Sequence, residues 1–157
     1  YEMGLIKNKY IGRTFIQPDQ KLRENTVRIK LNPIADTVRG KRVVLVDDSI
    51  VRGTTCDRIV AAMRRAGAKE VHLRISSPPF RHTCYFGTDI GSEENLIANQ
   101  LSIPEIEKKT GADTLGYISV AGLLEACRGS RLGLCTGCFT GKYATQVGAA
   151  SKDALEG

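Results

Sequence analysis

The feature that most constrains the fold is an unbroken aliphatic run, Arg42-Val-Val-Leu-Val-Asp47. Such a run is typical of a central parallel strand that is buried on both faces. Gly67 would end the helix that follows, and residues 71–75 alternate in polarity as a second strand does. A strand, a helix and a strand within about thirty residues form a βαβ unit, so we expect an α/β fold with a parallel sheet. The apolar stripe of the predicted helix consists of Cys56, Ile59, Val60 and Met63.

A pair of acids and a short polar loop follow the first strand. Asp47 and Asp48 stand where the strand ends, and ligands of open α/β sheets bind beyond the carboxyl ends of strands. Adjacent carboxylates can accept hydrogen bonds from a vicinal diol or lie near a divalent cation. The loop from Ser49 to Thr55 places hydroxyl and N–H groups at a helix N-terminus, which favours a phosphate, and Gly53 lets the backbone approach it. A strand end followed by a helix N-cap would explain one acid, but not two acids followed by Gly-Thr-Thr. The segment predicts a ligand that carries a sugar diol and a phosphate.

The positive charge is concentrated in one part of the sequence. Residues 1–42 contain ten Lys or Arg against four Asp or Glu and account for the whole formal net charge of +6. This indicates an anionic partner, either polyphosphate or nucleic acid, although a solvated basic surface is the simpler alternative. Residues 1–31 lack a sustained period, which is typical of a functional loop or a disordered segment. No RNA-binding motif or recognition helix is evident, so we expect no nucleic-acid partner.

The composition is that of an ordinary globular protein, with 41% apolar and 25% charged residues in a chain of 157. One domain fits this length. No stretch approaches the roughly 20 apolar residues of a membrane span, and no secretory signal is evident. We therefore expect a cytoplasmic protein that has no membrane partner.

Further elements are predicted downstream of the second strand. Ser92 looks like a helix start, and so does Ser102-Ile-Pro-Glu105, which has the form of a capping box. A short strand is expected within residues 114–119 and a short helix over 120–127. Residues 144–157 turn to Ala, Gly, Ser and polar side chains, which predicts a flexible tail.

Five cysteines are present, and two of them form the close pair Cys135-Thr-Gly-Cys138. Without a secretory signal, a disulfide framework is less expected than a metal, cluster or redox role. The pair alone suits zinc, an iron–sulfur cluster or a redox-active thiol pair. Cys56 and Cys127 fall within predicted helices, and we interpret them as buried apolar residues.

Val44-Leu-Val-Asp-Asp-Ser-Ile-Val-Arg-Gly-Thr-Thr55 resembles the phosphoribosylpyrophosphate-binding motif of type I phosphoribosyltransferases. The sequence of this segment is similar to that of the amidophosphoribosyltransferases, and the resemblance covers residues 2–143. It implies a type I phosphoribosyltransferase fold, a parallel sheet flanked by helices, that is incomplete in this chain. The other segments that resemble the family are Gly4 to Ile16, Arg28 to Pro33, Cys84 to Asp89, Glu94 to Ala98 and Cys135 to Tyr143.

The resemblance also implies a domain organisation. Residues 1–143 would be the C-terminal part of the phosphoribosyltransferase domain, with the mobile loop over 1–31. The strand, loop, helix and strand over 43–77 would form the substrate site, and 84–143 would supply C-terminal helices and cluster ligands. The family's N-terminal glutaminase domain is expected to be absent from this chain, which would leave the fragment inactive by itself.

Individual residues acquire expected roles from the same resemblance. Asp47 and Asp48 match the acids that hold the ribose hydroxyls and the Mg²⁺ of the substrate, an ion that prefers oxygen ligands. Lys7, Arg13 and Lys30 match cations that cover the pyrophosphate. Arg13 and Lys30 would be catalytic, because cations stabilise a departing polyanion. The residues that match the 5′-phosphate loop are Ser49, Ile50, Val51, Arg52, Gly53, Thr54 and Thr55.

The cysteines are reinterpreted by the resemblance. One branch of the family carries a [4Fe–4S] cluster, and Cys84, Cys135 and Cys138 match three of its ligands. Such a cluster takes four thiolates, and the fourth is expected outside this chain.

The implied activity is that of a glycosyltransferase of the first committed step of de novo purine synthesis. Ammonia from glutamine would replace pyrophosphate on phosphoribosylpyrophosphate, giving 5-phosphoribosylamine, pyrophosphate and glutamate. Purine nucleotides are expected as feedback inhibitors, and the protein is expected to be a homo-oligomer. Two alternatives share the fold: a salvage phosphoribosyltransferase, which would lack the cysteine pattern, and a regulator that binds nucleotides without catalysis.

Overall fold

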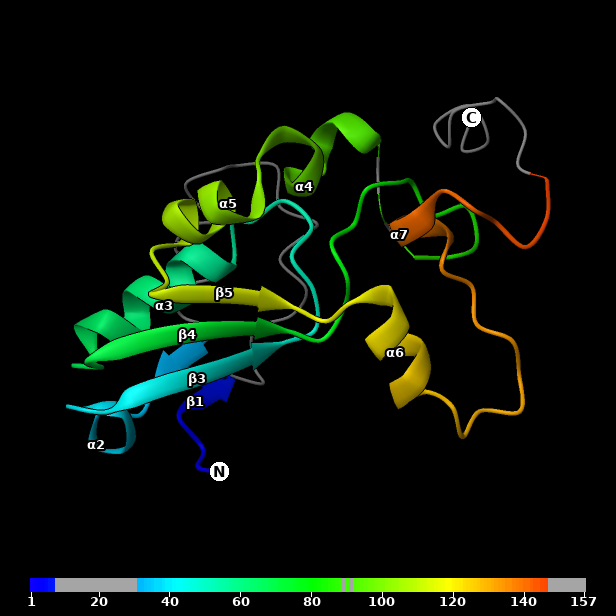
Figure 1. The fold of residues 1–157 in the computed structure, drawn as a ribbon. Helices are drawn as coiled ribbons and strands as arrows, with labels where there is room; N and C mark the ends of the chain where they lie inside the picture. The colour runs from blue at the N-terminus through cyan, green and yellow to red at the C-terminus, as the bar shows by residue number, and fades with distance from the viewer. Residues whose placement is uncertain (8–30, 89, 91, 147–157) are drawn as a thin grey trace. The chain divides into compact units, whose positions relative to one another are not determined.

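The computed structural model describes residues 1–7, 31–88, 90 and 92–146 (Figure 1). Arg13, Lys30 and most of the predicted tail lie outside the described residues. The chain divides into two compact units. The first unit comprises Tyr1–Leu45, Thr54–Leu73 and Glu107–Thr114, and the second comprises Val46–Gly53, Arg74–Ile106 and Leu115–Gly157.

Three strands confirm the predicted parallel sheet. β3 (Arg42–Asp47), β4 (Glu70–Ile75) and β5 (Thr114–Tyr117) pair in the order β3-β4-β5, and their arrows point the same way in Figure 1. β3 has the predicted bounds, and β4 begins one residue earlier than its alternating pattern indicated. α3 (Cys56–Arg65) connects β3 to β4 and completes the βαβ unit. The predicted α/β class is therefore confirmed.

The expectation that β3 is central and buried on both faces is wrong. Its residues alternate between exposed and half-buried, and Val44 and Val46 are 62% and 69% exposed. Within the described sheet, β3 is an edge strand. An unbroken aliphatic run indicates a preference for strand structure, but it does not reveal whether a second layer covers the outer face.

α3 buries the apolar stripe that its sequence predicts. Burial of each large apolar side chain contributes about 1.5–3 kcal/mol. The helix is followed by Gly67 at φ +96°, a conformation that glycine adopts without steric strain, so this predicted terminator is confirmed. Arg64 and Arg65 lie in the last turn, where cations interact favourably with the helix dipole. The buried residues of α3 are Cys56, Ile59, Val60 and Met63.

Periodicity does not predict the antiparallel pair at the start of the chain. β1 (Leu5–Lys7) pairs with β2 (Leu31–Pro33), so that Lys7 lies opposite Leu31. α2 (Ala35–Val38) follows β2, and the Ile34 N–H donates to the Gly4 carbonyl at 2.9 Å. The pairing joins segments that are separated by residues 8–30, and a local sequence pattern carries no information on such a contact.

The second unit has an apolar core of Phe80, Ile90 and Leu96, against which partly buried side chains pack. Ser92, a predicted helix start, is the N-cap residue of the short helix η2. The Ser119 hydroxyl accepts the Gly122 N–H at 3.0 Å and caps α6. The helical elements of this unit are η2 (Glu93–Asn95), α4 (Ile97–Gln100), α6 (Val120–Ala126) and α7 (Gly137–Thr140).

The predicted capping box is confirmed at the start of α5 (Ile103–Thr110). The N–H and the hydroxyl of Ser102 both donate to Glu105 Oε2, at 2.7 and 2.6 Å. These bonds stabilise the carboxylate and hold the pKa of Glu105 below its ordinary value. Every helix among the described residues is too short or too polar to cross a membrane.

Candidate functional site

The two predicted acids lie side by side where β3 ends. Asp47 is half-buried and Asp48 is exposed. The Asp48 N–H donates to Asp47 Oδ1 at 2.9 Å, and the Ser49 hydroxyl donates to Asp48 Oδ1 at 3.2 Å. The N–H and the hydroxyl of Ser76 both donate to the Asp47 carbonyl, at 2.9 and 3.1 Å, which fixes the backbone at this strand end. The arrangement presents two adjacent sets of carboxylate oxygens on a constrained backbone.

The loop after these acids is held against α4. The Ile97 N–H donates to the Val51 carbonyl at 2.9 Å, and Ile50 is buried. Gly53 is buried at φ +80°, and a Cβ built on it would lie 2.5 Å from Ile97 Cδ1. The left-handed backbone favours glycine here, and any larger residue would also have to displace the tip of the Ile97 side chain. Arg52 between them is exposed.

The last two residues of the predicted phosphate loop belong to the first unit. Thr54 and Thr55 are exposed, and Thr55 is the N-cap residue of α3. The Thr55 side chain forms no capping hydrogen bond within the described residues. In the first turn of α3, the Arg58 N–H donates to Asp57 Oδ1 at 2.6 Å, so a carboxylate of the helix itself already occupies one of the positions that favour an anion.

The three cations predicted to cover the pyrophosphate are not placed by the structure. Lys7 is the last residue of β1, but only its backbone is described. Arg13 and Lys30 lie outside the described residues. The roles of these three residues stay predictions.

Three of the five cysteines belong to the second unit. Cys84 and Cys138 are half-buried and pack against the Phe80–Ile90–Leu96 core, while Cys135 is exposed. Burial, and then repulsion from Cys84 and Cys135, raise the pKa of the Cys138 thiol. Cys84 and Cys138 thus share one apolar core, and Cys135 precedes Cys138 by three positions.

The two remaining cysteines differ from each other. Cys56 is buried on α3, as predicted, whereas Cys127 is half-buried at the C-cap of α6, so the prediction that Cys127 is buried is wrong. The side chain at a helix end has fewer neighbours than one in the middle of a packed face, and residue type alone does not reveal this difference. All five cysteines lie in the described part of the chain, and none of them forms a disulfide there.

The thiols and carboxylates are chemically suited to the iron–sulfur cluster and the Mg²⁺ that the resemblance implies, but their arrangement does not form a complete coordination site. Thiolates are the ligands of iron–sulfur clusters. Two carboxylates suit Mg²⁺ when substrate phosphates supply further oxygens. Within the described residues, no three His, Cys, Asp or Glu side chains are arranged to hold a metal ion.

Tyr143 lies beside the thiols and is a residue that sequence reasoning did not single out as part of the site. Its hydroxyl donates to the Thr83 carbonyl at 2.6 Å, and its ring meets Tyr85 edge-on with centroids 5.2 Å apart. Burial, followed by repulsion from Tyr85 and other groups, raises the pKa of Tyr143 to about 12. The phenol therefore stays protonated and acts as a donor near neutral pH. Tyr143 and Thr83 are 60 positions apart, so no local pattern could have identified the contact.

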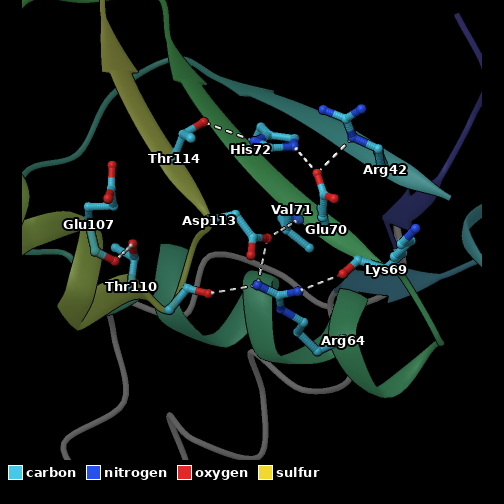
Figure 2. Close-up of polar contacts among 11 residues, drawn as sticks. Arg42, Arg64, Lys69, Glu70, Val71, His72, Glu107, Thr110, Asp113 and Thr114 are labelled. Atoms are coloured by element: carbon cyan, nitrogen blue, oxygen red, sulfur yellow. Dashed lines mark hydrogen bonds and ion pairs between the residues drawn. The ribbon is translucent and has the colours of Figure 1, made fainter. Parts of the chain in front are cut away.

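In the first unit, a polar network ties α3 to β4 (Figure 2). Asp113 Oδ2 accepts Arg64 Nη2 and the Val71 N–H, each at 2.6 Å. Arg64 also donates to the carbonyls of Lys69 and Gly111, at 3.1 and 3.4 Å. The hydrogen bond from Arg64 is the main reason that the pKa of Asp113 is lowered. The C-terminal end of α3 is therefore anchored to the start of β4 and to the residue that precedes β5.

A second chain of contacts crosses the strands of the same unit in Figure 2. Arg42 Nε donates to Glu70 Oε2 at 2.7 Å, and His72 Nε2 lies 3.0 Å from the same oxygen. His72 Nδ1 lies 2.9 Å from Thr114 Oγ1. These bonds, led by that from His72, lower the pKa of Glu70. The contacts link β3, β4 and β5 through side chains as well as through the backbone.

Comparison with known proteins shows which family and which proteins this chain is similar to. Residues 4–77 match the family described as Phosphoribosyl transferase domain. The chain is 56% identical over 151 residues to an amidophosphoribosyltransferase of Bacillus subtilis, covering 94% of this chain and 32% of the relative. It is 56% identical over 149 residues to an amidophosphoribosyltransferase of Archaeoglobus fulgidus, covering 94% of this chain and 33% of that relative.

Solved structures agree with these sequence relatives. One is the glutamine phosphoribosylpyrophosphate amidotransferase from B. subtilis complexed with ADP and GMP, with a TM-score of 0.80 and 54% identity. The match covers 96% of this chain and 34% of that one. A structure described as the allosteric regulatory enzyme of purine biosynthesis gives the same TM-score and identity and is covered to 33%. The chain thus spans about a third of the length of these relatives and is similar to amidophosphoribosyltransferases over 94% of its own length.

Proposed function

We propose that this chain is part of an amidophosphoribosyltransferase acting in the first committed step of de novo purine synthesis. The enzyme transfers glutamine-derived ammonia to C1 of phosphoribosylpyrophosphate and forms 5-phosphoribosylamine, pyrophosphate and glutamate. The observation that carries this proposal is the pair Asp47–Asp48 at the end of β3, followed by a loop with a glycine at positive φ. Similarity to amidophosphoribosyltransferases over 94% of the chain favours this activity over a salvage transferase or a non-catalytic regulator.

The acids and the loop would divide the recognition of the substrate between them. Asp47 and Asp48 accept hydrogen bonds from the ribose hydroxyls, and bonds to a charged acceptor are the stronger kind. The loop over Ser49 to Thr55 holds the 5′-phosphate, because N–H groups at a helix N-terminus favour an anion. Gly53 permits the close approach of the backbone to that phosphate.

Departure of pyrophosphate is the step that needs charge stabilisation. Lys7, Arg13 and Lys30 would lie over the pyrophosphate and offset the charge that develops on it. Ammonia is already a nucleophile, so the reaction requires no strong general base. Asp47 and Asp48 would hold Mg²⁺ together with substrate oxygens, and the ion would neutralise part of the pyrophosphate charge.

The three neighbouring thiols would serve a different purpose. We assign Cys84, Cys135 and Cys138 as three ligands of a [4Fe–4S] cluster, with a fourth ligand from outside this chain. The packing of Cys84 and Cys138 against the same core, with Cys135 three positions before Cys138, supports this assignment. The cluster would cross-link segments that are distant in sequence, as bound metals do in other proteins.

The remaining parts of the proposal concern the whole protein. We infer a glutaminase domain that supplies ammonia, a homo-oligomeric assembly and a cytoplasmic location. We also infer inhibition by purine nucleotides, which is supported by the ADP and GMP named with the similar B. subtilis structure.

A steady-state assay of the intact protein tests the proposed reaction. Release of pyrophosphate from phosphoribosylpyrophosphate should depend on ammonia or glutamine and should need no nucleobase. An absolute requirement for a purine or pyrimidine base would show that a salvage transferase is the correct reading.

Calorimetry tests the substrate site separately from turnover. Replacing Asp47 and Asp48 together by asparagine should weaken phosphoribosylpyrophosphate binding by at least about tenfold, because hydrogen bonds to charged groups are lost. The matched control is Asp36→Asn, an acid of α2 outside the loop, which should bind as the wild type does. Equal affinity in the double variant and the control would remove these acids from the site.

A further inference from the structure

The Tyr143 side chain contacts both segments that carry the neighbouring cysteines. On one side, its hydroxyl donates to the carbonyl of Thr83 at 2.6 Å, and Thr83 is only 7% exposed. This carbonyl belongs to the peptide group that joins Thr83 to Cys84. Because a peptide group is planar, the hydrogen bond fixes the orientation of the backbone that leads into Cys84.

On the other side, the Tyr143 ring lies on Gly137, between Cys135 and Cys138. A Cβ built on Gly137 would overlap the Cδ1 and Cε1 atoms of the ring, so only glycine leaves room for the ring. Gly137 is buried and begins α7, the helix that carries Cys138. The ring therefore determines how closely the turn that carries the cysteine pair can approach the Thr83–Cys84 segment.

Neighbouring aromatic side chains hold the ring in this place. Tyr85 meets it edge-on at 5.2 Å between centroids, and Phe86 lies at 6.2 Å. Both residues directly follow Cys84 in the sequence. Backbone bonds add a separate link, since the N–H groups of Arg81 and His82 both donate to the Cys138 carbonyl at 3.0 Å. Loss of the Tyr143 hydroxyl would thus loosen the arrangement without separating the two segments.

We propose that Tyr143 is a positioning residue that sets the spacing of Cys84 relative to Cys135 and Cys138, through its bond to Thr83 and its packing on Gly137. The assignment of these thiols to a cluster rests on the proposed function, whereas the spacing itself concerns only this chain. Residues that orient metal ligands from behind commonly change metal affinity by roughly tenfold or more when they are replaced.

The test compares three variants of the intact protein, prepared without oxygen. Tyr143→Phe removes only the hydroxyl, and Gly137→Ala places a methyl group against the ring. Alanine favours helix over glycine by about 1 kcal/mol, so a loosened site in Gly137→Ala would point to the ring and not to α7. Tyr85→Phe is the matched control, because it removes a tyrosine hydroxyl next to Cys84 and leaves the bond to Thr83 intact.

Two measurements are made on each variant. The first is the half-time of the visible absorbance in air, together with iron and acid-labile sulfide content. The second uses metal-free protein and measures the yield of Cys84–Cys138 cross-links formed by a short bis-maleimide, mapped by mass spectrometry. Far-UV circular dichroism verifies that each variant is folded.

We expect Tyr143→Phe to shorten the half-time by roughly tenfold and to lower the cross-link yield severalfold, with Tyr85→Phe unchanged. Wild-type values for both measurements in folded Tyr143→Phe and Gly137→Ala would overturn the proposal. If Tyr143→Phe does not fold, the absorbance half-time and the cross-link yield of Gly137→Ala decide whether the proposal holds. If the wild type itself holds no iron or sulfide, the cluster assignment fails, and the cross-linking comparison alone decides whether Tyr143 sets the spacing.

Discussion

Arg64 and Asp113 form an ion pair with 2.6 Å between Nη2 and Oδ2, although 49 positions separate them in the sequence. The same carboxylate oxygen accepts the N–H of Val71 at 2.6 Å. One oxygen thus joins the last turn of α3 to the start of β4 and to the residue before β5.

Replacing Asp113 by alanine should lower the midpoint of thermal unfolding, because Arg64 and the Val71 N–H both lose their acceptor. The control is Arg128→Ala, which breaks an exposed pair with Glu125 and should change the midpoint little. Equal midpoints for the two variants would contradict a special role of the Asp113 carboxylate. Circular dichroism provides the measurement.

The contribution of Asp113 should also depend on pH. Its pKa is lowered in the folded chain, chiefly by Arg64, so its stabilising effect is complete above the ordinary pKa of about 4. The effect is lost as the pH falls through the lower folded value. Urea unfolding at about pH 7 and about pH 2 should show the gap between wild type and Asp113→Ala shrinking in acid.

Gly53 and Gly40 form a matched pair for separating two effects. Both have positive φ, +80° and +71°, but only Gly53 has a side chain in the space of an added Cβ. Gly40→Ala should cost about 1 kcal/mol from the backbone alone, and Gly53→Ala should cost more because it overlaps Ile97. Chemical denaturation would measure both, and equal losses would mean that Ile97 moves aside without cost.

Tyr143 should ionise at a higher pH than an ordinary tyrosine. Its pKa of about 12 lies above the ordinary value, so the folded state keeps its proton while the unfolded chain loses it. The stabilising effect is complete below about pH 10 and disappears as the pH rises to about 12. Ultraviolet difference titration should find a late-ionising phenol that is absent from Tyr143→Phe.

The cysteines offer a prediction with an internal control. Cys138→Ser should abolish most iron and acid-labile sulfide in protein prepared without oxygen, because it removes a thiolate ligand. Cys127→Ser changes a half-buried cysteine at the end of α6 and should keep the wild-type content. The same metal content in both variants would argue against the ligand assignment.

Local patterns were sufficient for much of the fold. The bounds of β3 and the buried stripe of α3 follow from residue type and spacing, because strand and helix preferences act over a few neighbours. The Ser102–Glu105 capping box is also local, since its two residues are three positions apart. The acids and the glycine of the loop were placed correctly for the same reason.

Features that depend on distant neighbours could not be predicted this way. The exposure of Val44 and Val46 depends on whether another layer of the fold covers them. The pairing of Lys7 with Leu31 joins two strands that are distant in the sequence, so it depends on the tertiary fold. Tyr143 reaches Thr83 across 60 positions, and only a three-dimensional structure brings the two together. The sequence therefore named candidate ligand residues, but it could not name the contact of Tyr143 with Thr83.

The contact between Gly53 and Ile97 makes their evolution interdependent. A shorter residue at position 97 would open room for a Cβ at position 53, yet the left-handed backbone would still resist it. The effects of substitutions at the two positions should therefore not be additive. Truncating Ile97 should restore part of the stability that Gly53→Ala loses, but never all of it. Position 97, more than forty positions from Gly53 in the sequence, becomes a site where the genetic background decides whether a change in the loop after β3 is tolerated.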